Sequence, residues 1–309
     1  MVKLASGDKV AILSPASIIN PDYVGGAADT LRQWGLCPVV MPHTLGEHGS
    51  FSGSSRERLS DLTDALLDPS VKAIVCSRGG YGCVHLLAAL DRLMASGDIA
   101  PKWLVGFSDI SALHALWGKH GWPSVHASMT KHLAVAGPED PLNLRLLSIL
   151  RGEKPDLTMP AGFSGSPAGK LSRPGKGEGM VVGGNLAVIG GLVGTPMNPV
   201  RPGSILLIED IAEPIYKVER ILWQLRLAGI FDNLAGLMVG QFTDYRAPSR
   251  DHADMYAMID SFLSEGGAAP SFPVAMDIPV GHIDDNHPVI LNLKASLEVG
   301  EGRASLRYH

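Results

Sequence analysis

The sequence predicts an α/β protein with an N-terminal parallel-sheet domain and a smaller C-terminal mixed, partly antiparallel domain. Three observations support this fold class. In the first half of the chain, short apolar runs alternate with stretches that have helical spacing of apolar residues, which is typical of a parallel sheet covered by helices. The middle of the chain is rich in Gly, Pro and Ser, and the C-terminal end consists of strand-like runs alone.

The elements of the first half follow from local signals. Asn20 and Pro21 provide an N-cap and a first-turn proline for a helix. Pro38 places its strand at a sheet edge, because proline has no N–H to donate to a neighbouring strand. The predicted strands are Lys9–Ser14, Leu36–Met41, Val71–Ser77, Trp103–Phe107 and Ser124–His126, and the predicted helices begin after Asn20, at Ser55, at Val84 and at Ile110.

The second half has a different organisation. The Gly-rich composition of residues 161–179 predicts a linker between a domain of residues 1–160 and a domain of residues 180–309. We expect the second domain to combine three helices with several strands. The helices are Leu186–Val193, a segment with Ile215, Val218, Leu222 and Leu225 on one face, and Asp254–Leu263; the strands are Ser204–Ile208, Leu234–Gln241, Val289–Leu293, Ser296–Val299 and Ala304–Tyr308.

Composition excludes several classes of protein. The net charge of −5 over 309 residues gives no basic footprint, so we expect no nucleic-acid partner. Three cysteines are too few for a disulfide framework, and the first ten residues lack the apolar core of a signal peptide, so we expect a cytoplasmic protein. The uncharged stretch Gly179–Val200 is rich in glycine, which favours a packed internal helix over a membrane span.

A glycine-rich turn follows the third predicted strand, with the sequence Ser77-Arg78-Gly79-Gly80-Tyr81-Gly82. Ligand sites of parallel sheets lie at the carboxyl ends of strands, and bare backbone there can direct N–H groups at an anion. A dinucleotide-binding fingerprint is the alternative, but the pattern counted from Gly80 lacks the third glycine. A tight turn without function also remains open.

Ser108 lies at the next strand-to-helix junction, two residues after Gly106. This position is typical of a nucleophile elbow, although Ile110 stands where the hydrolase signature GxSxG has its second glycine. The alternative is that Ser108 or Asp109 caps the following helix.

A nucleophilic serine needs a base and a group that orients the base. His282 ends an apolar run beside Gly281, and Glu209 and Asp210 end the strand predicted at residues 204–208. A metal site at His282 and His287, with Asp284 and Asp285, is possible but has no standard ligand spacing.

Six blocks of the sequence, taken together and in order, resemble the LD-carboxypeptidase family of serine peptidases, the muramoyltetrapeptide carboxypeptidases. The blocks are GDKVAILSPAS, SRGGYGCVHLLAALD, VGFSDISALH, VVGGNLAVIGGLVGTP, LLIEDIAEPIYKVERILWQLRLAGIF and IPVGHIDDN. The resemblance implies an N-terminal parallel α/β domain and a C-terminal mixed domain, with a catalytic triad across their interface.

The resemblance also implies the roles of site residues. Ser108 would be the nucleophile, His282 the general base and Glu209 the acid that orients it. The backbone N–H groups of Gly80 and Asp109 would stabilise the oxyanion, and no metal or organic cofactor would be needed.

The expected activity is hydrolysis of the L,D-amide of murein tetrapeptides, with release of terminal D-alanine, by a homodimer. The free carboxylate of the substrate would be bound by Arg78, the backbone around Gly79 and Asn185. The loop after Gly281-His282 differs from the family pattern, and we expect this loop to lie near the substrate. A family branch that deactivates microcin-type acyl-sulfamoyl adenylates is the first alternative, and a nicotinamide-dependent reductase or an anion-binding α/β protein are others.

Overall fold

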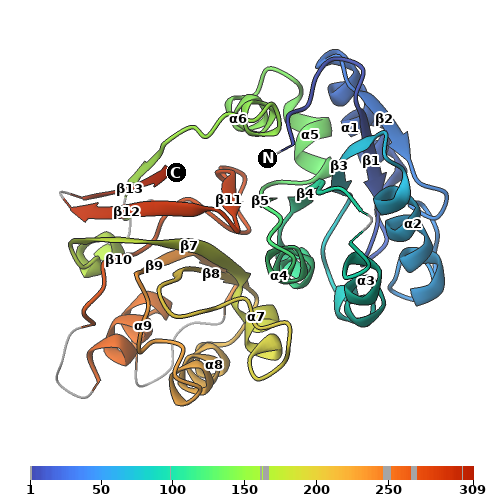
Figure 1. The fold of residues 1–309 in the computed structure, drawn as a ribbon. Coiled ribbons are helices and arrows are strands. Elements are labelled where there is room, and N and C mark those ends of the chain that lie inside the picture. Colours follow the sequence, from blue (N-terminus) through green and yellow to red (C-terminus); the bar gives the residue numbers. More distant parts are fainter. Residues whose placement is uncertain are drawn as a thin grey trace. The chain divides into compact units, whose positions relative to one another are not determined.

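The computed structural model describes residues 2–97, 99–160, 162, 167–245, 252–265, 270–300 and 302–309. The chain divides into two compact units, each built around its own sheet (Figure 1). Unit 1 consists of Met1–Pro155 and Pro288–Asn292, and unit 2 consists of Asp156–His287 and Leu293–His309. The predicted α/β class, with one mostly parallel and one mixed sheet, is confirmed.

The sheet of unit 1 has the strand order β11-β5-β4-β3-β1-β2. All neighbouring pairs are parallel except β11 and β5, which are antiparallel. The edge position predicted from Pro38 is confirmed, since β2 has only β1 beside it. The strands are β1 (Lys9–Leu13), β2 (Cys37–Val40), β3 (Val71–Cys76), β4 (Trp103–Gly106), β5 (Ser124–His126) and β11 (Val289–Leu291).

Helices cover both faces of this sheet. Helices α1 and α5 pack together on one face, and α2, α3 and α4 lie on the other (Figure 1). This division follows from the right-handed crossover rule, because β2 lies on one side of β1 and the later strands lie on the other. The helical elements are α1 (Pro21–Gln33), α2 (Ser55–Leu67), η1 (Cys83–His85), α3 (Leu87–Met94), η2 (Ser108–Ile110), α4 (Ser111–Lys119), α5 (Thr130–Ala136) and α6 (Pro141–Leu150).

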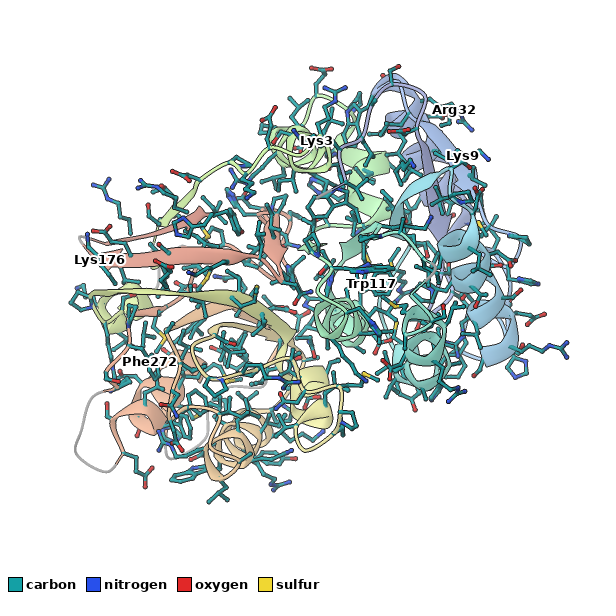
Figure 2. All side chains as sticks on the ribbon, viewed as in Figure 1. Lys3, Lys9, Arg32, Trp117, Lys176 and Phe272 are labelled. Carbon is teal, nitrogen blue, oxygen red and sulfur yellow. The ribbon has the colours of Figure 1, made fainter. Side chains whose placement is uncertain are left out.

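Apolar burial between sheet and helices explains why unit 1 forms. Trp117 of α4 is fully buried in this core, whereas Lys9 and Arg32 lie at the surface (Figure 2). Asn20 accepts a hydrogen bond from the Asp22 N–H at the start of α1, as the sequence predicts. Ser54 and Glu57 form a capping box that begins α2.

The sheet of unit 2 has the strand order β10-β9-β8-β7-β12-β13-β6. Strands β10, β9, β8 and β7 are parallel to one another, and β7, β12, β13 and β6 pair antiparallel. The strands are β6 (Leu157–Pro160), β7 (Gly175–Asn185), β8 (Ile205–Ile211), β9 (Gly236–Thr243), β10 (Val274–Ala275), β12 (Lys294–Gly300) and β13 (Arg303–Tyr308).

The helical elements of unit 2 are η3 (Pro167–Leu171), α7 (Leu186–Leu192), α8 (Ile215–Leu227) and α9 (Met255–Ser264). They cover the parallel part of the sheet and share one apolar core with it, in which Phe272 is buried (Figures 1 and 2). The predicted buried face of α8 is confirmed, because its buried residues are Ile215, Val218, Leu222 and Leu225.

The Gly-rich middle of the chain is more ordered than the linker prediction implies. Part of the segment 161–179 lies outside the described residues, but η3 and the first five residues of β7 belong to it. A Cβ atom on Gly177 would lie 1.7 Å from the Ala235 carbonyl oxygen, and one on Gly179 would lie 1.9 Å from that of Gly203. These glycines therefore permit close backbone packing of a strand. The predicted helix Leu186–Val193 within the uncharged stretch is confirmed by α7, which spans Leu186–Leu192.

Two expected domain assignments are also wrong. The run predicted as a strand at Val289–Leu293 contributes β11, which pairs with β5 in unit 1 and not with the other C-terminal strands. Strand β6, within the predicted first domain of residues 1–160, pairs with β13 in unit 2. Local apolar pattern predicts a strand but does not say which sheet it joins, which explains both errors.

Within the described residues, the structure has no helix with the length and apolarity that crossing a bilayer requires.

The close packing of β7 gives a direct stability test. Replacing Gly177 with Ala places a methyl group on the Ala235 carbonyl, so we expect the free energy of unfolding to fall by about 2 kcal/mol or more. The control is Gly191→Ala in α7, where nothing lies within 4 Å of the added carbon. Its free energy of unfolding should rise by about 0.5–1 kcal/mol, because alanine is a better helix former than glycine. Urea unfolding of both variants checks this, and equal stability of Gly177→Ala and wild type would contradict the close packing.

Candidate functional site

The glycine-rich turn lies where the topology of unit 1 predicts a ligand site. Helices α1 and α3, which follow the adjacent strands β1 and β3, lie on opposite faces of the sheet, so the loops after these strands meet at a topological switch point. The turn contacts the loop after β1, where the Ser17 N–H donates to the Gly79 carbonyl at 3.3 Å. A Cβ on Gly80, whose φ is +112°, would collide with the Ser17 side chain.

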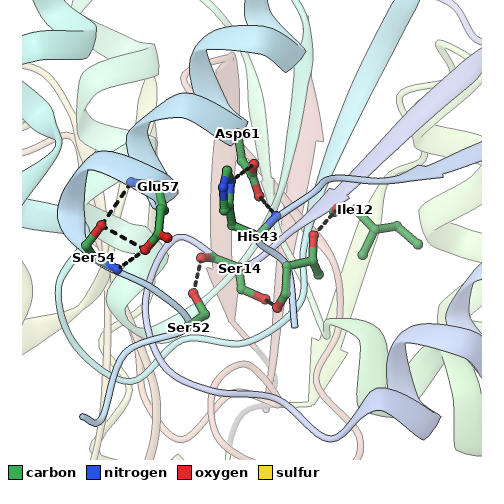
Figure 3. A network of polar contacts seen from close by, with 8 residues as sticks. Ile12, Ser14, His43, Ser52, Ser54, Glu57 and Asp61 are labelled. Atoms are coloured by element: carbon green, nitrogen blue, oxygen red, sulfur yellow. Dashed lines mark hydrogen bonds and ion pairs between the residues drawn. The ribbon is translucent and has the colours of Figure 1, made fainter. Parts of the chain in front are cut away.

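A polar network supports this edge of the sheet (Figure 3). Ser52 Oγ donates to the Ser14 carbonyl at 2.5 Å, and Thr44 Oγ1 donates to the Ile12 carbonyl at 2.9 Å. Ser14 Oγ donates to the Thr44 carbonyl and also contacts Ser77 Oγ at the start of the glycine-rich turn. The loops after β1, β2 and β3 are thereby tied to one another through buried groups.

Ser108 occupies a strained backbone position between β4 and α4. Its φ is +65°, a left-handed conformation that costs a non-glycine residue about 1–2 kcal/mol. Neither η2 nor α4 has a side-chain hydrogen bond at its N-cap, so the helix-cap interpretation of Ser108 and Asp109 is not supported. A strained, half-buried serine at a strand-to-helix turn is the geometry of a nucleophile elbow.

Two glycines make room for this elbow. A Cβ on Gly106 would lie 2.9 Å from the Ile110 side chain, inside the turn itself. A Cβ on Gly79 would lie 2.7 Å from the Cβ of Ser108 and 3.2 Å from the Asp109 nitrogen. The glycine-rich turn therefore lies directly against Ser108. Within the described part of the chain, neither the Gly80 N–H nor the Asp109 N–H donates a hydrogen bond.

Unit 2 holds an acid–imidazole pair. Glu209, near the end of β8, has no exposed surface, and its Oε2 lies 2.7 Å from Nδ1 of His282. Glycines allow the carboxylate to be enclosed, since a Cβ on Gly281 would lie 3.0 Å from that oxygen and one on Gly240 would lie 3.2 Å from the Glu209 Cβ. Asn286 Oδ1 accepts from the Gly281 N–H at 2.9 Å and holds the turn that carries the imidazole.

The electrostatics of this pair favour a protonatable imidazole. Burial by itself would lower the pKa of His282, but the hydrogen bond and charge of Glu209, with the charges of Asp210 and Asp244, raise it above the ordinary value. The acidic partner at Nδ1 also leaves Nε2 as the ring nitrogen directed away from the carboxylate, which is the arrangement of a general base held by an acid.

Asp210 and Asn185 form a second polar pair beside Glu209. Asn185 Nδ2 donates to Asp210 Oδ1 at 2.8 Å, and Asp210 Oδ2 accepts from the Ala187 N–H at the start of α7. Burial and the neighbouring Glu209 carboxylate raise the pKa of Asp210 to about 6. Asn185 Oδ1 also accepts from the Val188 N–H. The Asn185 amide therefore holds both the Asp210 carboxylate and the first turn of α7.

The remaining predicted residues have distinct positions. Arg78 is exposed in unit 1, and its guanidinium donates to the Ile18 carbonyl at 2.9 Å. His287 lies 3.6 Å from Asp285, but no group of three or more His, Cys, Asp and Glu side chains among the described residues is placed to hold a metal ion.

Two buried residues near the elbow were not among the predicted site residues. His114 Nε2 lies 2.9 Å from the Gly106 carbonyl, and burial lowers the pKa of His114 to about 3. Arg58 of α2 is 1% exposed and donates to loop carbonyls, including that of Gly82 in the glycine-rich turn. The available signal was weak: Arg58 shares a helix face with Leu62, and a charged residue on an apolar face is a candidate for a buried role.

Known proteins resemble this chain along its whole length. Residues 10–127 match the LD-carboxypeptidase N-terminal domain, and residues 178–297 match the LD-carboxypeptidase C-terminal domain. The murein tetrapeptide carboxypeptidase of Pseudomonas aeruginosa is 32% identical over 283 residues, which cover 89% of this chain and 88% of that protein.

Solved structures agree. The crystal structure of muramoyltetrapeptide carboxypeptidase from Oxalobacter formigenes is 27% identical, covers 97% of this chain and 98% of its own, and has a TM-score of 0.81. An MccF-like protein from Bacillus anthracis has the same TM-score at 21% identity, with 100% of this chain and 99% of that chain covered, which shows a shared fold. With both domain matches in order and a relative above 30% identity, the chain belongs to the LD-carboxypeptidase family.

Proposed function

We propose that this protein is a serine carboxypeptidase that hydrolyses the L,D-amide bond of murein tetrapeptides and releases terminal D-alanine. The observation that carries the proposal is the 2.7 Å contact between the enclosed Glu209 carboxylate and Nδ1 of His282, which is the arrangement of a base oriented by an acid. The strained backbone of Ser108 supplies a matching nucleophile. The family, and the relatives named as murein peptide carboxypeptidases, support the substrate class.

The proposed reaction has two halves. Ser108 Oγ attacks the carbonyl carbon of the scissile amide while His282 Nε2 accepts the hydroxyl proton, and Glu209 stabilises the imidazolium. His282 then protonates the departing nitrogen, so that D-alanine leaves and an acyl-enzyme remains. Water, deprotonated by His282, attacks the ester, and the returned proton restores the Ser108 hydroxyl.

The N–H groups of Gly80 and Asp109 are proposed to stabilise the oxyanion. Both lack an acceptor within the described residues, and the glycine-rich turn lies against the serine. Loss of one such donor typically costs about 3 kcal/mol of transition-state stabilisation.

Recognition of the terminal carboxylate is proposed for Arg78, the backbone around Gly79 and Asn185. Arg78 is exposed beside the elbow in unit 1 and can form a charge-assisted hydrogen bond with an anion. In unit 2, Asn185 donates to Asp210 and accepts from the Val188 N–H, so its proposed part in recognition is to hold the start of α7. A homodimer and a cytoplasmic location stay predictions from the sequence.

The alternative substrate is a microcin-type acyl-sulfamoyl adenylate. One structural neighbour is MccF in complex with glutamyl sulfamoyl guanosine, but at 20% identity this likeness concerns the fold alone. An assay of both substrate classes separates the branches: we expect hydrolysis of the murein tetrapeptide and none of an aspartyl sulfamoyl adenosine.

Ser108→Ala tests the nucleophile. We expect kcat to fall at least about 1,000-fold, because the proposed acyl-enzyme forms on this hydroxyl, while substrate binding and Tm stay close to wild type. Ser148→Ala, at a half-buried helical serine in the same unit, is the matched control and should retain full activity. A large drop in Tm with proportionate loss of activity would instead indicate a structural serine.

Glu209→Gln tests the acid by pH dependence. The base must be neutral, so activity falls as the pH falls through the pKa of His282, which Glu209 raises. Removing that charge lowers this pKa, so the acidic limb of the kcat/KM profile should move to lower pH while kcat falls about 100-fold or more. The control Glu219→Gln, on α8, should leave the profile unchanged. If the acidic limb of Glu209→Gln stays at the wild-type pH, a group other than Glu209 raises the pKa of His282.

A substrate series tests recognition of the free carboxylate. We expect release of alanine from the tetrapeptide, and no hydrolysis of its C-terminal amide or of the pentapeptide, since an exopeptidase must bind the terminal anion in a closed-ended site. Quantifying released alanine from the three peptides decides the matter. Equal rates for the acid and the amide would support a general amidase.

A further inference from the structure

Arg58 is a buried cation that the proposed reaction does not use. Its side chain is 1% exposed, and none of the described carboxylates forms an ion pair with it. Enclosing a guanidinium without a carboxylate partner costs several kcal/mol, which a Met or Leu side chain in its place would avoid. Its hydrogen bonds must therefore offset that cost.

These hydrogen bonds join three loops at the carboxyl edge of the unit 1 sheet. Arg58 Nη1 donates to the Pro15 carbonyl at 2.5 Å and to the Gly82 carbonyl at 3.1 Å, and Nε donates to the Gly53 carbonyl at 3.1 Å. The ring of Phe51 lies below the guanidinium, 4.7 Å from its central carbon. The planar fork thus fixes the loop after β1, the loop before α2 and the glycine-rich turn in one geometry.

The Gly82–Cys83 peptide is also held at its nitrogen. The Cys83 N–H, which belongs to the same peptide unit as the Gly82 carbonyl, donates to Asp109 Oδ2 at 2.8 Å. One peptide plane is therefore held by a cation at its oxygen and by a carboxylate at its nitrogen. Asp109 follows Ser108 directly, so this peptide links the guanidinium to the elbow.

Position 82 has room only for glycine, because a side chain there would meet the Arg58 guanidinium and the Phe51 ring. Gly82 has φ +119°, and a Cβ there would lie 3.0 Å from Arg58 Nη1 and 2.8 Å from the Phe51 ring. The Gly80 N–H lies two residues before the clamped peptide, in a segment with two positive φ values and no regular hydrogen bonding. The orientation of that N–H depends on where the clamped peptide is anchored.

We propose that Arg58 is a positioning residue for the glycine-rich turn: with Asp109, it fixes the Gly82–Cys83 peptide and so aims the Gly80 N–H relative to Ser108. This inference rests on the proposed serine carboxypeptidase activity, in which that N–H stabilises the oxyanion. In this proposal Arg58 acts through its hydrogen bonds to the loop carbonyls and not by contact with the substrate.

The test compares Arg58→Met with Arg56→Met, an exposed arginine on the same helix. We expect Arg58→Met to lower kcat for D-alanine release about 10- to 100-fold with KM changed little, because a misaimed donor loses transition-state stabilisation and not ground-state binding. Arg56→Met should match wild type. A wild-type kcat in Arg58→Met overturns the proposal.

A double-mutant cycle separates positioning from simple stability. If Arg58 and Asp109 hold one peptide, the kcat loss of Arg58→Met combined with Asp109→Ala should be clearly smaller than the product of the single losses. Multiplicative losses would overturn the shared clamp. Should Arg58→Met not fold, Arg58→Lys carries the test: an ammonium keeps the charge but not the fork, so kcat should still fall, and full recovery of kcat by lysine would overturn the proposal.

The wild-type protein distinguishes failure of the proposed carboxypeptidase function from failure of the positioning role of Arg58. If wild type releases no D-alanine, that function fails, and the rate at which a fluorophosphonate labels Ser108 becomes the readout. Slower labelling in Arg58→Met than in Arg56→Met, at equal Tm, supports the positioning role, and equal labelling rates overturn it.

Discussion

The enclosure of the Glu209 carboxylate is the constraint on which the organisation of unit 2 depends. A carboxylate with no exposed surface must be stabilised by its neighbours, and His282 provides the contact that accomplishes this at 2.7 Å. The enclosure requires bare backbone at Gly240 and Gly281, because side chains there would meet the acid. Asp210, next along β8, takes the structural hydrogen bonds to α7 and leaves Glu209 to the imidazole.

In unit 1, glycines also leave space for a side chain at a strand end. Ser108 is held at a left-handed backbone position, and Gly79 and Gly106 provide the space that this conformation needs. The polar network behind β1 and the Arg58 fork fix the loops around it (Figure 3). In each unit a candidate catalytic side chain, Ser108 or Glu209, lies at or near the carboxyl end of a strand, beside glycines whose missing Cβ atoms leave it space. The glycine content is thus a requirement of the candidate site as well as of turns.

Much of the fold was predictable because its signals are local. Asn20 and Pro21 mark the start of α1, Pro38 marks an edge strand, and Ile215, Val218, Leu222 and Leu225 mark the buried face of α8. The errors concern long-range pairing. Gly177 and Gly179 are typical of a linker in sequence, yet they lie in a strand because the carbonyls of Ala235 and Gly203 pack against them. Nothing within Val289–Leu291 indicates that it pairs with β5.

Prediction of the candidate site had a similar limit. The positions of Ser108, Glu209 and His282 at predicted strand ends made them candidates. Glu209 and His282 are far apart in sequence, and it was the family resemblance that paired them before the structure showed their contact. The role of Arg58 was not predictable, since three of its hydrogen bonds go to backbone carbonyls from separate loops and carbonyls have no sequence signature. Asn185 was expected to take part in substrate binding; the structure adds its hydrogen bond to Asp210, which nothing in the sequence indicated.

The central claim is that Ser108 is a nucleophile activated by His282. Its most direct test is peptide mapping by mass spectrometry after treatment with a serine-directed fluorophosphonate, applied to wild type and to His282→Ala. The account predicts a single adduct on Ser108 in wild type and almost none in His282→Ala at the same reaction time, because the unactivated hydroxyl is a poor nucleophile. An adduct at another residue, or equal labelling of Ser108 without His282, would contradict it.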